Sequence, residues 1–196
     1  MDSQGSFVGG SPRMSGSHAV FCAPAVRGCA SIAVDYRLAP ALGLRGRRAP
    51  YPAAVDDCEK GGGSWRKFAE QHGLPADRRF IGGVNAGGAV AASLALRSLD
   101  SGSGAPTGVS AAHPTLLPSS LLRVGHLAAD QEHFAQGLAC IGRPVEVAFE
   151  PGTCHDHLNM PRRPGFTHSI GCHGDWLNGN LGSWHPQLVI GLPARR

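Results

Sequence analysis

The sequence predicts an α/β fold, with a mainly parallel sheet that has helices on both faces. Short apolar runs typical of strands alternate along the chain with longer runs of helical periodicity. A glycine-flanked turn, Phe80-Ile-Gly-Gly-Val-Asn-Ala-Gly-Gly-Ala89, joins one such apolar run to an alanine-rich one. The length of 196 residues and the hydrophobic fraction of 42% suit one domain with a sizeable core.

The glycine-flanked turn follows the G-x-S-x-G pattern of a nucleophile elbow. A strand that turns sharply into a helix needs small residues beside the corner, because a Cβ there would meet the neighbouring strand or the first helical turn. Gly83, Gly87 and Gly88 meet that need. The corner residue is Asn85, where the pattern has serine. Since asparagine tolerates positive φ, the sequence keeps the turn but loses the attacking hydroxyl.

Before this turn, the sequence predicts a short helix over 17–27, a buried strand over Cys29–Tyr36 and a helix from 51 to 69. The last of these contains Gly61-Gly-Gly63, and a mid-helix glycine costs about 1 kcal/mol relative to alanine. We therefore expect a kink or a break there. Near the start, Val8-Gly-Gly-Ser11 is a strand end with two glycines, whose N–H groups suit a developing oxyanion or simply a flexible turn.

After the turn, the pattern predicts further elements in the order helix, strand, strand, helix, strand, namely 89–99, 107–113, 121–124, 129–140 and 145–149. A loop follows over 150–157. From residue 161 the periodicity is lost, so we predict one domain over 1–160 and an irregular, poorly ordered tail over 161–196.

Composition argues against several classes of function. The 18 Lys and Arg are scattered against 14 Asp and Glu, which predicts no nucleic-acid partner. No apolar run approaches the roughly 20 residues of a membrane span, and the first residues lack the pattern of a signal peptide. The six cysteines have no framework spacing, so we expect reduced thiols and a cytoplasmic protein. No cofactor motif is present and no oligomeric state follows.

Four blocks in the right order resemble the hormone-sensitive-lipase-like branch of the α/β-hydrolases, the fold-3 group of acetyl esterases and carboxylesterases. The blocks are Val34-Asp-Tyr-Arg-Leu-Ala-Pro40, Tyr51-Pro-Ala-Ala-Val-Asp-Asp-Cys58, Gly82-Gly-Val-Asn-Ala-Gly-Gly88 and Pro151-Gly-Thr-Cys-His155. The resemblance covers residues 5 to 160. It implies a truncated α/β-hydrolase domain, without the cap and without a connecting segment between Pro114 and Leu121.

The same resemblance implies site residues. His155 matches the catalytic base, and Asn85 occupies the nucleophile position. The acid position holds Ala128, with Asp130 as the nearest carboxylate. The oxyanion hole would consist of Gly9, Gly10 and Ala86, because the family's H-G-G-G motif looks like Val8-Gly-Gly-Ser11 here.

A serine esterase needs a hydroxyl, a histidine and an orienting carboxylate, and two of these three are missing. We therefore expect carboxylic-ester hydrolysis to be lost or severely weakened. Three alternatives stay open. Asn85 deamidates to a carboxylate nucleophile; the emptied pocket binds a small ester or hydrophobic ligand; or a loop metal site forms from Cys154-His-Asp-His157 with His168, Cys172 and His173.

Overall fold

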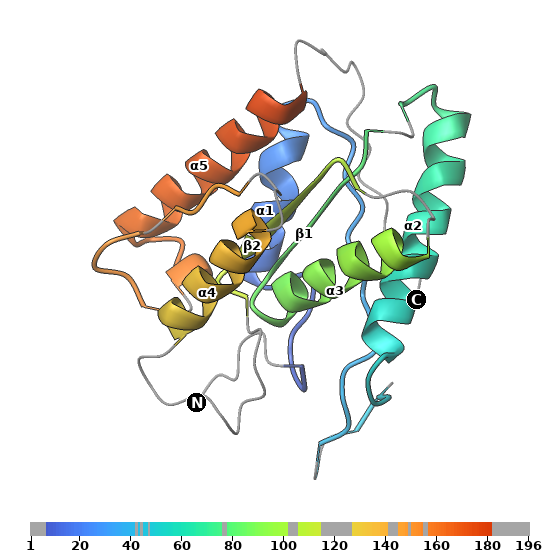
Figure 1. Cartoon of the computed structure of the whole chain (residues 1–196), viewed down its shortest axis with the longest axis horizontal. Coiled ribbons are helices and arrows are strands. Elements are labelled where there is room, and N and C mark those ends of the chain that lie inside the picture. The colour runs from blue at the N-terminus through green and yellow to red at the C-terminus, as the bar shows by residue number, and fades with distance from the viewer. Residues whose placement is uncertain are drawn as a thin grey trace.

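The computed structural model describes residues 7–41, 43, 45–46, 48–75, 78–101, 106–114, 127–140, 145–148, 150–154 and 157–181. Figure 1 shows the elements in chain order. These are α1 (Ser15–Ala25), α2 (Ala53–Gln71), β1 (Phe80–Val84), α3 (Ala86–Asp100), β2 (Gly108–Ala112), α4 (Leu127–Cys140), the 3-10 turn η2 (His157–Asn159) and α5 (Pro164–Leu181).

The sheet of the described residues has two strands, and they are parallel. β1 pairs with β2 in a register that sets Gly82 opposite Ser110 and Val84 opposite Ala112. Parallel strands need a crossover, and α3 supplies it, so β1, α3 and β2 form one βαβ unit. Both strands lie where the sequence predicts them.

Helices cover both faces of this sheet, which confirms the predicted fold class (Figure 1). On one face, Gly88 of α3 lies so close to the sheet that a Cβ there would be 3.4 Å from the Ala111 Cβ. On the other face, the Trp176 ring of α5 packs edge-on against Phe80, with ring centroids 5.9 Å apart. α1 lies on the same side as α5, in contact with α5 and β1.

The core is built mainly from the small residues at the start of α3. Ala86, Ala89, Val90, Ala91 and Ala92 are all buried. Alanine has the highest helix propensity and little bulk, so this helix forms readily and approaches the sheet closely. Arg97 in its last turn suits the negative end of the helix dipole.

Helix α2 is continuous over 19 residues, so the expected kink at Gly61–Gly63 is wrong. Tertiary packing outweighs the helix-propensity cost. A Cβ at Gly61 would lie 2.7 Å from Val34 Cγ2, so glycine lets the helix pack directly on the segment 29–36.

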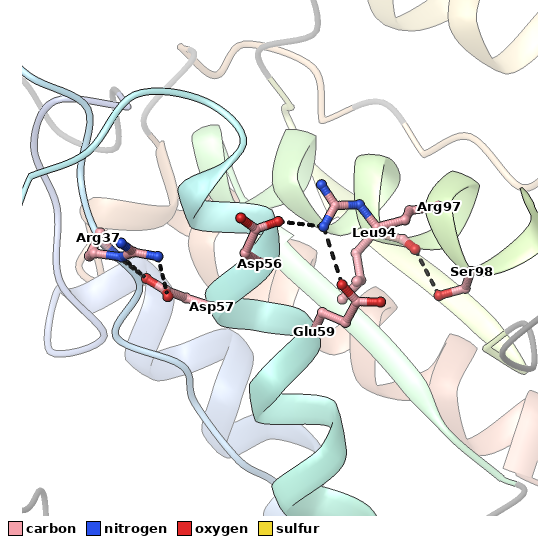
Figure 2. A network of polar contacts seen from close by, with 7 residues as sticks. All are labelled: Arg37, Asp56, Asp57, Glu59, Leu94, Arg97 and Ser98. Atoms are coloured by element: carbon pink, nitrogen blue, oxygen red, sulfur yellow. Dashed lines mark hydrogen bonds and ion pairs between the residues drawn. The ribbon is translucent and has the colours of Figure 1, made fainter. Parts of the chain in front are cut away.

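Ion pairs tie α2 to its neighbours (Figure 2). The guanidinium of Arg37 donates two hydrogen bonds to the Asp57 carboxylate, 2.8 and 2.9 Å long, and the Arg37 backbone N–H donates a third. These bonds from Arg37 lower the pKa of Asp57 to about 2. Arg97 of α3 binds the neighbouring carboxylates Asp56 and Glu59. The loop after the segment 29–36 and helix α3 are therefore both fastened to α2.

Other expectations differ from the structure. Cys29–Tyr36 and 145–148 are not strands in the described part of the chain, and none of the residues 29–36 is buried. An extended segment becomes a strand only when a neighbouring strand takes up its backbone hydrogen bonds. Helix α5 lies within 161–181, where the sequence predicted an irregular tail. The strand expected over 121–124 falls outside the described residues.

Candidate functional site

The corner between β1 and α3 has the backbone geometry of a strained elbow. Asn85 lies there with φ 54° and ψ −116°. Its N–H donates to the carbonyl of Ala112 at 2.9 Å, and its own carbonyl accepts from Ala89 N–H at 3.2 Å. Only 6% of Asn85 is exposed. The residue thus joins the end of the sheet to the first turn of α3, in a conformation that few non-glycine residues adopt.

The glycines beside the corner are required by close backbone approach, as the sequence predicted. A Cβ at Gly83 would lie 2.2 Å from the carbonyl carbon of Gly87. A Cβ at Gly88 would lie 3.0 Å from Pro114 Cβ and 3.1 Å from the Gly83 carbonyl oxygen. A side chain therefore does not fit at Gly83, and one at Gly88 would require its neighbours to shift by a few tenths of an ångström.

A cavity of about 550 Å³ opens beside the corner, and Asn85, Gly9 and Gly10 all line it. Gly10 has φ 131°, which favours glycine. Ala86, the third residue expected at an oxyanion hole, is buried as the first residue of α3. The structure therefore brings the glycine pair and the corner to one cavity.

Arg48 holds the glycine loop, a role that the sequence did not indicate. Its Nη1 donates to the carbonyls of Val8, at 2.9 Å, and Ala39, at 2.7 Å. The Ala39 N–H donates in turn to the carbonyl of Phe7. Arg48 belongs to a basic stretch without periodicity, so no sequence pattern separates it from its neighbours.

Tyr36 and Trp65 are two of the aromatic residues that line the cavity. The Tyr36 hydroxyl lies 3.9 Å from the position that a Cβ of Gly87 would take. Burial raises the pKa of Tyr36 to about 12, so the hydroxyl stays protonated at neutral pH and can donate a hydrogen bond. Trp65 of α2 has a buried indole N–H without an acceptor among the described residues.

The structure does not describe the side chains of the other two triad candidates, His155 and Asp130. His155 lies outside the described residues, and Asp130 lies on α4 in a stretch whose side chains are not described. The nearby His157 is described: its Nε2 lies 2.9 Å from Ser169 Oγ, and its ring centroid is 5.6 Å from that of His113.

The candidate metal ligands lie in separate contacts. His168 binds Glu150 through Nδ1, and its Nε2 lies 3.7 Å from Cys172 Sγ. His173 instead faces Ser110. Among the described residues, which leave out 155 and 156, no group of three or more His, Cys, Asp or Glu side chains is arranged to hold a metal.

A comparison with protein families decides the lineage. The family model for the alpha/beta hydrolase fold matches residues 4–125. The chain belongs to the α/β-hydrolase family. No curated protein matches the sequence significantly.

Several of the solved structures similar to this α/β-hydrolase are esterases by name. Esterase Est22 superposes with a TM-score of 0.72 at 19% identity, and the match covers 92% of this chain and 70% of the Est22 chain. Carboxyl esterase 2 from the mycorrhizal fungus Tuber melanosporum has a TM-score of 0.70 at 16% identity, with 90% and 76% covered. EstE7, a homolog of hormone-sensitive lipase from a metagenome library, has a TM-score of 0.59 at 21% identity, with 76% and 66% covered.

These neighbours, together with the family match, confirm the resemblance to the hormone-sensitive-lipase-like branch drawn from the motifs. The α/β-hydrolase described here spans 66% of the length of EstE7. Within its described residues, no helix is both long and apolar enough to cross a bilayer.

Proposed function

We propose that this α/β-hydrolase is of carboxylic-ester hydrolase lineage and that its ester-hydrolysing activity is lost or severely weakened. The observation that carries the proposal is Asn85, a buried carboxamide at φ 54° on the corner beside the cavity. In esterases built on this corner, the residue there attacks the ester carbon. A carboxamide lacks a nucleophilic oxygen of that kind, so no acyl-enzyme forms at position 85.

The remaining groups can assist only weakly. Gly9, Gly10 and the N–H of Ala86 would stabilise an oxyanion, and His155 would help water to attack directly, with Asp130 as a doubtful orienting acid. Such a site retains about 10³- to 10⁴-fold acceleration over the uncatalysed reaction when the nucleophile is missing. The protein is, on this proposal, a pseudoenzyme or a very slow esterase.

The test is hydrolysis of p-nitrophenyl acetate by the purified chain beside its Asn85→Ser and Asn85→Gly variants. Serine restores the hydroxyl, and we expect a gain on the order of 10²-fold or more that is abolished by adding His155→Ala. Glycine keeps the backbone turn without a hydroxyl and should leave the slow rate unchanged. A burst of p-nitrophenol from the wild-type chain, lost in His155→Ala, would refute the proposal. Intact-mass measurement checks for deamidation of Asn85.

A second candidate is binding of a small ester or hydrophobic ligand without turnover. The cavity of about 550 Å³ supports it, because Trp65 contributes a buried N–H without an acceptor in the described part of the chain. A ligand carbonyl would satisfy that donor. A non-hydrolysable ketone analogue of a naphthyl ester should raise the melting temperature of the wild type but much less that of Trp65→Phe. Equal shifts in both proteins would argue against this role.

We also propose that the protein works in a reducing compartment, the cytoplasm. All six cysteines are free thiols in the structure. Disulfides persist in oxidising compartments and are rare where glutathione keeps thiols reduced. Titration of thiols in protein isolated under acid quenching should find all six reactive after denaturation, whereas a paired set would contradict the assignment.

A further inference from the structure

A serine and a histidine meet in the cavity away from the elbow corner. Ser110 Oγ lies 2.8 Å from His173 Nδ1, although the two residues are 63 positions apart in the chain. Ser110 is the central residue of β2, His173 lies on α5, and both line the cavity. Opposite Ser110 on β1 is Gly82, which has no side chain to cover the hydroxyl.

The His173 ring also interacts with a neighbouring helix. The backbone of Val20 in α1 favours the protonated form of the ring, so it opposes in part the lowering of the pKa of His173 by burial. A neutral imidazole has one N–H and one acceptor nitrogen. In the tautomer that carries its N–H on Nε2, Nδ1 accepts the proton of the Ser110 hydroxyl. That tautomer is the one that a general base needs.

Burial lowers the pKa of His173, and the nearby positive charge of Arg27 lowers it further. The ring is therefore neutral at pH 7, with Nδ1 available to accept a proton. A serine hydroxyl hydrogen-bonded to a neutral histidine is the arrangement that activates serine as a nucleophile.

We propose that Ser110 is a nucleophile, with His173 as its general base, toward small activated acyl or phosphoryl electrophiles that enter the cavity. This site is independent of Asn85 and goes beyond the proposed loss of elbow chemistry. Any reaction with activated esters that does not need His155 is then assigned to β2 and α5, and not to the corner between β1 and α3.

The step balances within the groups present. Ser110 Oγ attacks the carbonyl carbon of an aryl ester while its proton passes to His173 Nδ1. The bond to the aryl oxygen breaks, and the phenol leaves with the electron pair and that proton. Water then attacks the acyl-serine, gives a proton to Nδ1 and releases the acid and Ser110. With diisopropyl fluorophosphate, Ser110 Oγ bonds to phosphorus, the P–F bond breaks, fluoride leaves with the proton from Nδ1, and the phosphoryl-serine adduct persists.

The cavity also offers a serine without a histidine partner. Ser98 of α3 lines the cavity, but its hydroxyl donates to the Leu94 carbonyl at 2.8 Å instead of to a histidine (Figure 2). Because Ser98 is more deeply buried than Ser110, His173→Gln, which leaves the Ser110 hydroxyl in place, is the comparison that separates activation from access.

The experiment treats the full chain with diisopropyl fluorophosphate and maps the adduct by peptide mass spectrometry. We expect the label on Ser110 and not on Ser98, its loss in Ser110→Ala, and labelling slowed on the order of 10²-fold in His173→Gln. Far-UV circular dichroism and melting curves establish that the variants fold. Should either variant fail to fold, the pH dependence of Ser110 labelling in the wild type decides, because labelling must slow as His173 becomes protonated and a rate that does not change with pH would overturn the proposal.

Equal labelling of the two serines, no label on Ser110, or a wild-type rate in a folded His173→Gln would overturn the proposal. Failure of the proposed loss of elbow activity has a different signature. It would appear as ester hydrolysis that survives Ser110→Ala and disappears in His155→Ala.

Discussion

Two short apolar segments, Phe80–Val84 and 29–36, adopt different structures in this molecule. Phe80–Val84 becomes strand β1, paired along its length with β2 and leading into the elbow corner. The segment 29–36 stays outside the sheet, although residues of both segments line the same cavity. The difference shows that apolar character predicts an extended chain, whereas only a partner at hydrogen-bonding distance makes it a strand.

The two segments are also held by different forces. β1 is locked by backbone hydrogen bonds and by glycines that allow α3 to approach. The segment 29–36 is held at its end by the Arg37–Asp57 pair and along its length by Val34 against Gly61. Substitutions that disturb β1 should therefore cost more stability than substitutions that release the segment 29–36.

The largest effect is expected for Gly83→Ala. The new Cβ would lie 2.2 Å from Gly87 backbone, where no flexible side chain can yield. We expect a loss of about 3 kcal/mol or more in the free energy of unfolding. Gly63→Ala, which meets nothing within 4 Å, should gain about 0.5–1 kcal/mol. Urea unfolding midpoints of both variants measure the difference, and similar midpoints would contradict the close approach.

Next in size is Asp57→Asn, which removes the charged acceptor of Arg37. A loss of about 2 kcal/mol is expected at pH 7, typical of hydrogen bonds to charged groups. Because folding lowers the pKa of Asp57 from 3.8 to about 2, its contribution is present above pH 3.8 and disappears as the pH falls toward 2. The free energy of unfolding of the variant should therefore fall less steeply than that of the wild type as the pH drops from about 4 to 2, which acid titration of urea unfolding measures.

Asp56→Asn is the matched control, since its more exposed ion pair with Arg97 should contribute less than about 1 kcal/mol. The interpretation fails if both variants lose the same stability at pH 7.

A smaller effect is expected from changing the corner residue itself. Asn85→Gly should hold stability or raise it by up to about 1 kcal/mol, because glycine adopts φ 54° and ψ −116° without strain. Asn85→Val should lower it by about 1–2 kcal/mol, because a β-branched side chain is strained at positive φ. Thermal unfolding compares the pair, and a valine variant as stable as the glycine variant would argue against the elbow conformation.

The smallest global effect belongs to Gly61→Ala. The gain in helix propensity, about 1 kcal/mol, opposes the cost of displacing Val34. Net stability should change by less than about 1 kcal/mol, while amide exchange over 29–36 becomes faster. Gly63→Ala shares the propensity gain without the contact, and should leave exchange in that segment unchanged.

Much of the candidate site could be predicted from the sequence because its constraints are local. The glycines around position 85 follow from the sterics of a tight turn, and an asparagine at positive φ is compatible with that turn. The Ser110–His173 contact and the hold of Arg48 on the glycine loop could not be predicted. Each joins residues from segments far apart in the chain, and neither has a spacing that a pattern search can recognise.

By itself the sequence determined the β1–α3–β2 unit, its strained corner and the absence of a hydroxyl at that corner, because all three depend on neighbours along the chain. Tertiary structure alone decided that 29–36 stays outside the sheet, that α2 runs unbroken through three glycines and that 164–181 forms a helix packed on α1. In those cases the stabilising free energy comes from contacts with residues distant in sequence, so local propensity does not predict the structure.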